Sequence, residues 1–131
     1  MKPKPPNLMT VLIVDDALFM RSMIRDILLG TGRFQIVGEA SNGREAVQKY
    51  EELKPEVVTM DIVMPELDGI EATREILRKD PGATIIMCSA LGQEALVIES
   101  MNAGAMDFIV KPFTPEKVLR AVDALAGRAT R

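Results

Sequence analysis

The sequence predicts an α/β protein: a doubly wound, five-stranded parallel sheet with helices on both faces. Short runs of Val, Ile and other apolar residues alternate along the chain with segments whose apolar residues recur at helical spacing. Runs that are apolar throughout are typical of strands buried on both faces of a sheet. Five strand–helix units follow one another at a spacing of roughly 25 residues, which is close to the length that a parallel β–α unit needs.

The strands are recognised by their apolar composition. We expect them to begin near Met9, Phe34, Glu56, Thr84 and Asp107. The first contains Val-Leu-Ile-Val at 11–14, the third Val-Val-Thr-Met at 57–60 and the fifth Phe-Ile-Val at 108–110. Runs this short, rich in Val and Ile, favour strands over helices.

Each strand is followed by a segment with helical periodicity. In chain order, the positions that define the five helices are Met20, Met23, Ile24, Ile27 and Leu28; Ala46, Val47, Tyr50 and Leu53; Ala72, Thr73, Ile76 and Leu77; Ala95, Ile98, Met101 and Asn102; and Val118, Leu119, Val122 and Leu125. Asp68 with Glu71 is typical of a capping pair at the start of the third helix. Thr114 followed by Pro115 predicts the N-cap and the first residue of the fifth helix.

Length and composition favour one domain. The chain has 131 residues, 47% of them hydrophobic, which is enough to build a core at this size. We expect a single domain over residues 8–126, with flexible tails at 1–7 and 127–131. The net charge of −3 and the absence of tryptophan argue against a nucleic-acid-binding surface.

Cysteine content and the N-terminal segment predict a cytoplasmic protein. Cys88 is the only cysteine, which excludes an internal disulfide and suits a reducing compartment. We expect it to be a packed side chain and not a reactive thiol. The segment 1–7 carries two lysines and three prolines, and the apolar run after it ends in two aspartates. It is therefore neither a secretion signal nor a membrane span.

Charged residues directly follow three of the predicted strands. Asp15 and Asp16 follow the first strand, Asp61 the third and Lys111 the fifth. If the strands are parallel, these charges lie at the edge of the sheet where open α/β sheets bind ligands. Two carboxylates about 4 Å apart repel by about 4 kcal/mol at an effective dielectric constant near 20. Three carboxylates should therefore either share a proton, with a raised pKa, or hold a divalent cation.

Other kinds of site are excluded by what the sequence lacks. The turn after the first strand, Asp-Asp-Ala-Leu at 15–18, has no glycine and is not a dinucleotide-binding loop, and no Gly-Lys-Ser or Gly-Lys-Thr sequence marks a P-loop. The chain has no histidine, which removes histidine-based acid–base catalysis, histidine-ligated zinc and serine–histidine triads. Oxygen ligands remain, and these suit Mg²⁺.

The charged residues belong to a longer ordered set. Asp15-Asp16 follows the first strand, Asp61 the third, Ser89 the fourth and Lys111-Pro112 the fifth. This set resembles the receiver domains of two-component response regulators, and the resemblance extends from about residue 10 to residue 125. Segments 15–21, 60–65 and 104–113 are most similar to chemotaxis response regulators of the CheY type and to the receiver half of the chemotaxis methylesterase. The resemblance implies the strand order 2-1-3-4-5, of which CheY-type regulators are themselves a standard example.

The resemblance also implies a phosphoacceptor and a metal site. Asp61 would be the residue whose carboxylate attacks a phosphoryl group and becomes an acyl phosphate. Asp15, Asp16, Asp61 and the backbone carbonyl of Val63 would hold Mg²⁺, with Mn²⁺ as a substitute. The phosphoryl group would come from a phosphohistidine on a partner kinase or from small acyl or amido phosphates.

Further roles are implied for residues after the fourth and fifth strands. Ser89 and Lys111 would each bind one phosphoryl oxygen. Ser89 and Phe108 would form the switch, in which the aromatic side chain turns inward on phosphorylation. The peptide bond before Pro112 is expected to be cis, a geometry otherwise found before only about 5–6% of prolines.

Taken singly, these residues have ordinary structural interpretations. Asp16 suits a helix N-cap, Ser89 a turn and Lys111 a solvated surface position. Three other residues depart from the family pattern. Phe108 stands where enteric chemotaxis regulators have a tyrosine, while Val63 and Leu91 are apolar where many relatives are polar. The last two positions border the path of the attacking water, so the dephosphorylation rate is open in either direction.

The function implied is that of a stand-alone response regulator, not an enzyme, that assists its own phosphorylation and dephosphorylation. The partners implied are a chemotaxis-type histidine kinase, a phosphatase, and a flagellar motor switch protein or other target on the face of the fourth helix, fifth strand and fifth helix. We expect a cytoplasmic monomer with no nucleic-acid or membrane partner. Two alternatives stay open: a receiver in a phosphorelay or phosphate sink, and a small Mg²⁺-dependent aspartyl phosphatase. The phosphatases usually place their two aspartates two residues apart, whereas Asp15 and Asp16 are adjacent.

Overall fold

The computed structural model describes residues 8–129, without the side chains at 122 and 125–129; residues 1–7, 130 and 131 lie outside it. Its elements follow the order β1 (Met9–Val14), α1 (Leu18–Gly30), β2 (Phe34–Ala40), α2 (Gly43–Leu53), β3 (Val57–Asp61), α3 (Gly69–Lys79), β4 (Ile85–Ser89), α4 (Glu94–Asn102), β5 (Asp107–Val110) and α5 (Pro115–Ala129). The strands begin within one residue of the expected positions. Helix α5 includes residues 127–129, which we expected in a C-terminal tail; the N-terminal tail expected at 1–7 lies outside the described residues.

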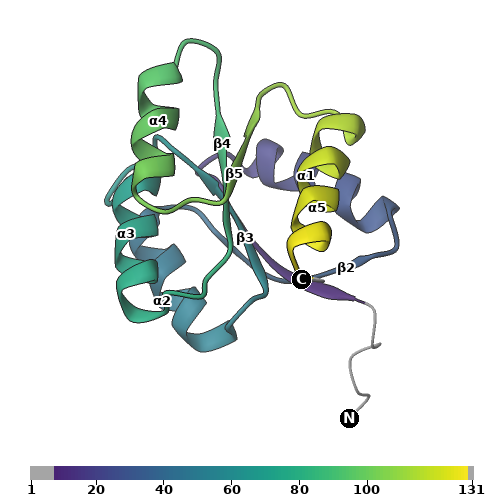
Figure 1. Cartoon of the computed structure of the whole chain (residues 1–131), viewed down its shortest axis with the longest axis horizontal. Coiled ribbons are helices and arrows are strands. Elements are labelled where there is room, and N and C mark those ends of the chain that lie inside the picture. Colours follow the sequence, from purple (N-terminus) through teal and green to yellow (C-terminus); the bar gives the residue numbers. More distant parts are fainter. Residues whose placement is uncertain (1–7, 130–131) are drawn as a thin grey trace.

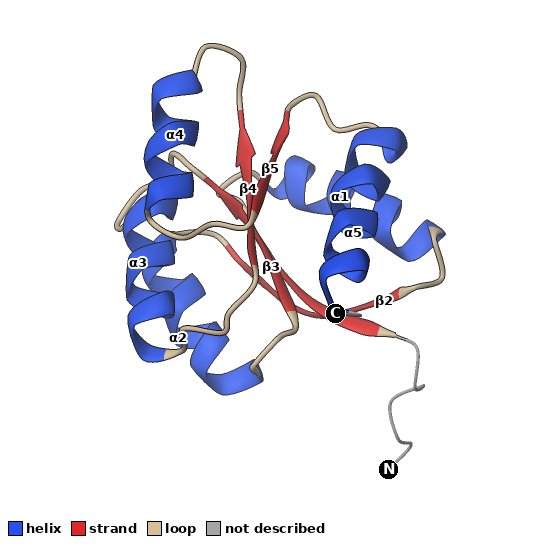
Figure 2. Ribbon diagram, viewed as in Figure 1, coloured by secondary structure: helices blue, strands red, loops and turns tan. Residues whose placement is uncertain are grey.

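All five strands pair in parallel, in the order β2-β1-β3-β4-β5. Helices α1 and α5 cover one face of the sheet, and α2, α3 and α4 cover the other (Figures 1 and 2). The predicted doubly wound fold and its strand order are therefore confirmed. In this order the chain leaves β1 towards one face and β3 towards the other, which opens a crevice beyond their carboxyl ends.

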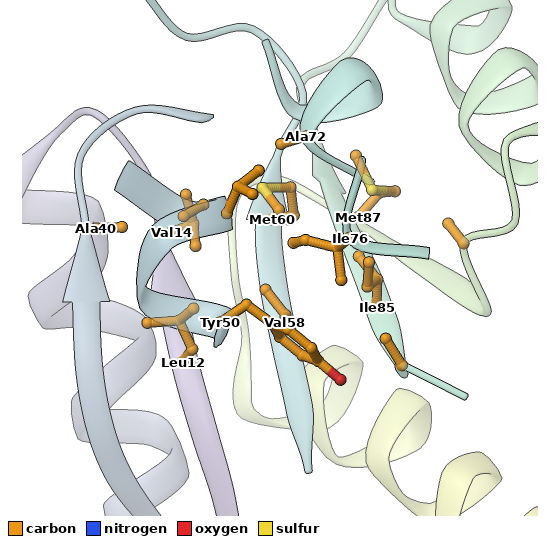
Figure 3. Packing of buried hydrophobic residues seen from close by; sticks show 14 of the residues in the cluster. Leu12, Val14, Ala40, Tyr50, Val58, Met60, Ala72, Ile76, Ile85 and Met87 are labelled. Atoms are coloured by element: carbon orange, nitrogen blue, oxygen red, sulfur yellow. The ribbon is translucent and has the colours of Figure 1, made fainter. Parts of the chain in front are cut away.

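Strand β1 shows why the predicted strands are apolar at every position. Val11 and Ile13 belong to the core cluster beneath α1 and α5, whereas Leu12 and Val14 belong to the cluster beneath α2 and α3. Figure 3 shows part of the second cluster, in which Met60 of the central strand is fully buried. Because the sheet is covered on both faces, alternate residues of one strand enter two different cores. None of the helices described over residues 8–129 is long and apolar enough to cross a membrane.

The predicted starts of α3 and α5 are confirmed by their capping bonds. The Asp68 side chain accepts a hydrogen bond from the Glu71 backbone N–H at 2.9 Å, and Thr114 Oγ1 accepts one from the backbone N–H three residues later at 3.2 Å. Pro115 is the first residue of α5. The Glu71 carboxylate pairs with Arg74. These caps fix where the loops after β3 and β5 end and the helices begin.

Helix α3 begins so close to β3 that its first residue must be glycine. A Cβ on Gly69 would lie 1.9 Å from the backbone oxygen of Asp61. The Gly69 N–H donates a hydrogen bond to the Ile62 carbonyl at 2.7 Å. The start of α3 is therefore packed directly against the strand end that carries Asp61.

Candidate functional site

Polar residues lie at the carboxyl ends of the four adjacent strands β1, β3, β4 and β5. Asp61 is the last residue of β3 and Ser89 the last residue of β4. Asp15 follows the end of β1, and Lys111 follows the end of β5. Parallel pairing places these ends at one edge of the sheet. The fold thus brings together the residues that we expected to share a site.

The Lys111 ammonium joins two of the carboxylates. Its Nζ lies 3.2 Å from Asp15 Oδ2 and 3.2 Å from Asp61 Oδ1. The side chains of Asp15 and Asp61 are only 5% and 10% exposed. The third acid, Asp16, is exposed at the rim. One ammonium therefore serves two buried carboxylates, and an excess of negative charge remains.

This arrangement shifts the pKa values of Asp61 and Lys111. Burial is the largest cause at Asp61; with the charge of Asp15 it raises the pKa of Asp61 to about 6, although Lys111 opposes the rise. Burial alone would lower the pKa of Lys111, but Asp61 and Asp15 outweigh it and raise that pKa overall. At neutral pH Lys111 is charged, and Asp61 is ionised but takes up a proton more readily than an ordinary aspartate.

The three acids fit a divalent cation. Asp15, Asp16 and Asp61 can each offer one carboxylate oxygen, and these oxygens lie within 4.8 Å of one another. Mg²⁺ prefers such all-oxygen donors and completes its shell with water. Val63, whose carbonyl we expected as a further ligand, lies two residues beyond Asp61 in the loop after β3. Its side chain is 56% exposed.

Ser89 has an unsatisfied hydroxyl. The residue is 1% exposed, and among the described residues its Oγ is the one buried side-chain nitrogen or oxygen atom without a hydrogen-bond partner. Leaving a buried hydroxyl unpaired costs about 1–3 kcal/mol. Such an atom calls for an explanation, and a phosphoryl oxygen arriving beside it would supply the missing acceptor.

Phe108 lies on the edge strand β5, next to the strand that carries Ser89. The residue is 41% exposed. It lines an open groove of about 550 Å³ between α4 and the ends of β4 and β5, together with Ser89, Leu91 and Ile98. The two residues expected to form the switch therefore border the same groove.

The remaining expected residues surround the site. Leu91, 81% exposed, lies in the loop after β4. The Lys111–Pro112 peptide bond is cis. Cys88 is buried, and burial raises the pKa of its thiol, which suits a packed side chain.

Two residues near the site received no role from the sequence. Gly69 is the first of them, and it packs against Asp61. Arg21 is the second; it lies within segment 15–21, and its Nη1 donates a hydrogen bond to the Asp15 carbonyl at 2.7 Å. The Asp-Gly pair at the start of α3 was a usable signal for Gly69. No local signal marks the second, because its partners lie on other elements.

Comparison with known proteins agrees with this site. A model of the family described as response regulator receiver domain matches residues 11–123. The chemotaxis protein CheY of Thermotoga maritima is 60% identical over 88% of this chain and 96% of its own length. The Bacillus subtilis chemotaxis protein CheY is 58% identical over 86% of this chain and 93% of its own length.

A solved structure agrees in fold. The crystal structure of the CheX–CheY–BeF₃–Mg²⁺ complex from Borrelia burgdorferi matches with a TM-score of 0.84 and 41% identity, over 89% of this chain and 88% of that one. The family match includes part or all of each of the five strands and both strand ends that carry the acids. This chain therefore belongs to the response regulator receiver domain family, is closely related to the CheY chemotaxis regulators, and is a signalling phosphoacceptor.

Proposed function

We propose that this protein is a chemotaxis response regulator that accepts a phosphoryl group on Asp61 from a histidine kinase, in a Mg²⁺-dependent reaction, and thereby switches target binding. One observation supports this assignment above the others. Asp61 is a buried acid at the end of the central strand β3, bonded to the Lys111 ammonium, in a site where the Ser89 hydroxyl has no partner. Phosphoryl transfer to a carboxylate needs a nucleophilic carboxylate, a positively charged side chain and a free hydrogen-bond donor, and these three residues supply them.

The residues have distinct tasks in the transfer. An oxygen of the ionised Asp61 carboxylate attacks phosphorus, the bond from phosphorus to the histidine nitrogen breaks, and an acyl phosphate forms on Asp61. The Lys111 ammonium exchanges a contact with one carboxylate oxygen for a contact with a phosphoryl oxygen, and the Ser89 hydroxyl donates a hydrogen bond to another phosphoryl oxygen. Asp15, Asp16, Asp61 and the Val63 carbonyl would hold Mg²⁺ or Mn²⁺. When bound, the ion neutralises negative charge on the phosphoryl oxygens.

Ser89 and Phe108 would transmit the phosphorylated state of Asp61 to the protein surface. The phosphoryl group draws Ser89 towards it, and Phe108 then fills the space beside β5. Burying a Phe side chain is worth about 1.5–3 kcal/mol, enough to bias a two-state equilibrium. The exposed position of Phe108 and the open groove beside it suit the resting state of such a switch. Ser89→Ala should accept phosphate but couple poorly to the target.

We further propose which surface of the protein binds its target. The face formed by α4, β5 and α5 would bind a flagellar motor switch protein, in keeping with the names of the chemotaxis relatives. A phosphatase is a further expected partner, and the Borrelia relative was solved in a complex with CheX. We expect a cytoplasmic monomer. Val63 and Leu91, both exposed and apolar beside the site, would set the lifetime of the phosphate by controlling the approach of water.

Labelling with acetyl phosphate and Mg²⁺, followed by intact-mass measurement and peptide mapping, tests the acceptor. The wild-type protein should gain one phosphoryl group on Asp61, and Asp61→Asn should gain none. Asp107→Asn, which changes an aspartate on β5 outside the acid cluster, should label like the wild type. Full labelling of Asp61→Asn would overturn the assignment. Multiple turnover of free phosphate esters would instead indicate an aspartyl phosphatase.

A further inference from the structure

The loop that carries Asp15 and Asp16 is held from outside the acid cluster by one arginine of α1. Arg21 Nη1 donates a hydrogen bond to the Asp15 carbonyl oxygen at 2.7 Å. Arg21 Nε donates another to Glu39 Oε1 at 3.0 Å. The Arg21 side chain is only 16% exposed. Both bonds are charge-assisted, and the planar guanidinium fixes their relative directions.

The end of β2 anchors this arginine. Glu39 lies on β2, and its second carboxylate oxygen accepts a hydrogen bond from Arg25 Nη1 at 3.0 Å. The next residue, Ala40, accepts a hydrogen bond from the Asp15 N–H at 3.1 Å. The backbone of Asp15 is therefore held on both sides by the end of β2: directly at its N–H, and through Arg21 at its C=O.

Local sequence offers this loop little other support. Helix α1 has Ala17 at its N-cap, without a side-chain capping bond and without an acidic residue in its first turn. The Asp15 carboxylate supplies part of the missing cap, since its Oδ1 accepts a hydrogen bond from the Ala17 N–H at 2.9 Å. Its Oδ2 faces Lys111. The bond from Ala17 closes a turn that includes the peptide between Asp15 and Asp16, and Arg21 holds the carbonyl oxygen of that same peptide from outside the turn.

We propose that Arg21 is a positioning residue for the metal site. By holding the Asp15 carbonyl against Glu39, it fixes the peptide that joins the two acids and so presents both carboxylates to one divalent cation. Partners that orient metal ligands from outside the coordination shell typically contribute 10–100-fold to metal affinity. The inference rests on the proposed function, because it concerns the same cation site.

Titration with Mn²⁺, followed by electron paramagnetic resonance of the free ion, tests the proposal. Arg21→Gln should weaken Mn²⁺ binding by about 10-fold, and Glu39→Gln should weaken it in the same direction, because it releases Arg21 without removing it. Arg21→Lys keeps the charge but cannot bridge both oxygens with a fixed fork, so it should not restore the affinity. Wild-type affinity in Arg21→Gln, or full recovery in Arg21→Lys, would overturn the proposal.

Arg25→Gln is the matched control. Arg25 binds the same glutamate but does not reach the Asp15 carbonyl in the described contacts. It should change Mn²⁺ affinity by less than about twofold, because a half-exposed ion pair contributes little. An equal loss in Arg25→Gln and Arg21→Gln would show that the ion-pair cluster acts only on stability, and would overturn a specific role for Arg21.

Hydrogen exchange in metal-free protein separates this inference from the proposed function. The Ala17 amide should exchange faster in Arg21→Gln than in Arg25→Gln, whether or not the site binds a cation. Asp16→Asn should weaken Mn²⁺ binding while leaving that exchange rate close to the wild-type value. If Asp16→Asn binds Mn²⁺ normally, the cation site fails; if Ala17 exchange is unchanged in Arg21→Gln, the positioning role fails.

Discussion

The side of the sheet where the strands begin, the amino edge, differs from the side where they end, the carboxyl edge, in how its polar residues are paired. At the amino edge, the Tyr50 hydroxyl donates a hydrogen bond to Asp80 Oδ2 at 2.7 Å, and Glu56 accepts from the Thr10 N–H at 2.9 Å. At the carboxyl edge, like charges lie close together and the Ser89 hydroxyl has no partner. These polar groups at the amino edge are therefore paired. The carboxyl edge contains a conflict, since its carboxylates repel one another and a buried hydroxyl has no partner.

The two edges differ because one contributes to stability and the other carries the candidate functional site. Pairs at the amino edge contribute to stability, because each donor meets an acceptor without any ligand. Groups at the carboxyl edge would be satisfied only when a cation and a phosphoryl group arrive, so the resting protein carries their cost. Functional sites commonly conflict with stability in this way. Substitutions that relieve the conflict should stabilise the fold at one edge, and substitutions that break pairs should destabilise it at the other.

The largest expected gain in stability comes from Asp61→Asn in metal-free buffer. The pKa of Asp61 is raised to about 6 in the folded protein, so ionising Asp61 opposes folding. That penalty is absent below the ordinary aspartate pKa, grows as pH rises, and is complete above about pH 6. Asp61→Asn should raise the free energy of unfolding by about 2 kcal/mol at pH 8, after allowance for solvent screening.

Urea denaturation across pH 4–8, in the presence of a chelator, measures this gain. The advantage of Asp61→Asn should disappear towards pH 4, where the wild-type carboxyl is protonated in both states. Added Mg²⁺ should stabilise the wild type more than the variant if the acid cluster holds the ion, because a ligand that binds only the folded state stabilises it. A variant less stable than the wild type at pH 8 would contradict the conflict at the carboxyl edge.

Gly69→Ala should reduce stability at the same edge by about 1–3 kcal/mol, the range for overpacking a tight contact. Its Cβ would meet the Asp61 backbone oxygen at 1.9 Å, so the strand end must move. Phosphorylation by acetyl phosphate should slow as well. Gly30→Ala is the control, because a Cβ there meets nothing within 4 Å. Equal thermal stability for both variants would show that the contact with Asp61 can relax freely.

Tyr50→Phe should cost about 1 kcal/mol, the typical contribution of one hydrogen bond, and should leave phosphorylation unchanged. Tyr50 is the only tyrosine, so circular dichroism is the suitable probe of unfolding. The result isolates the amino edge, because the Tyr50 hydroxyl is bonded to Asp80 and not to any residue of the acid cluster. A loss of phosphorylation in this variant would show that the two edges are coupled.

Ser89→Ala should have the smallest effect on stability, within about 0.5 kcal/mol of the wild type or slightly stabilising, because the lost hydroxyl makes no hydrogen bond. Ser100→Ala removes another buried serine hydroxyl, one that already donates to the Leu96 carbonyl at 2.8 Å. Phosphorylation-dependent target binding should fail in Ser89→Ala and persist in Ser100→Ala. A destabilisation of more than 1 kcal/mol in Ser89→Ala would mean that its hydroxyl has a partner in solution.

The site could be predicted from the sequence because parallel strands place the residues that follow them at one edge of the sheet. Asp15, Asp61 and Lys111 could be assigned to that edge without knowing any distance between them. Residues whose roles depend on contacts between different elements could not be found in this way. Gly69 matters because α3 starts against β3, and Arg21 matters because β2 supplies Glu39 beside it.

The amino-acid sequence was sufficient to predict the alternation of strands and helices, the burial of the sheet on both faces and the starts of α3 and α5, because these depend on periodicity and on caps within a few residues. It left open whether three carboxylates share a proton or hold a cation, and the strand order came from the family resemblance. The folded protein was needed to show which acids are buried, that Lys111 lies between Asp15 and Asp61, and that the Ser89 hydroxyl lacks a partner. The physical reason is that burial, charge separation and hydrogen-bond satisfaction arise from contacts between residues far apart along the chain.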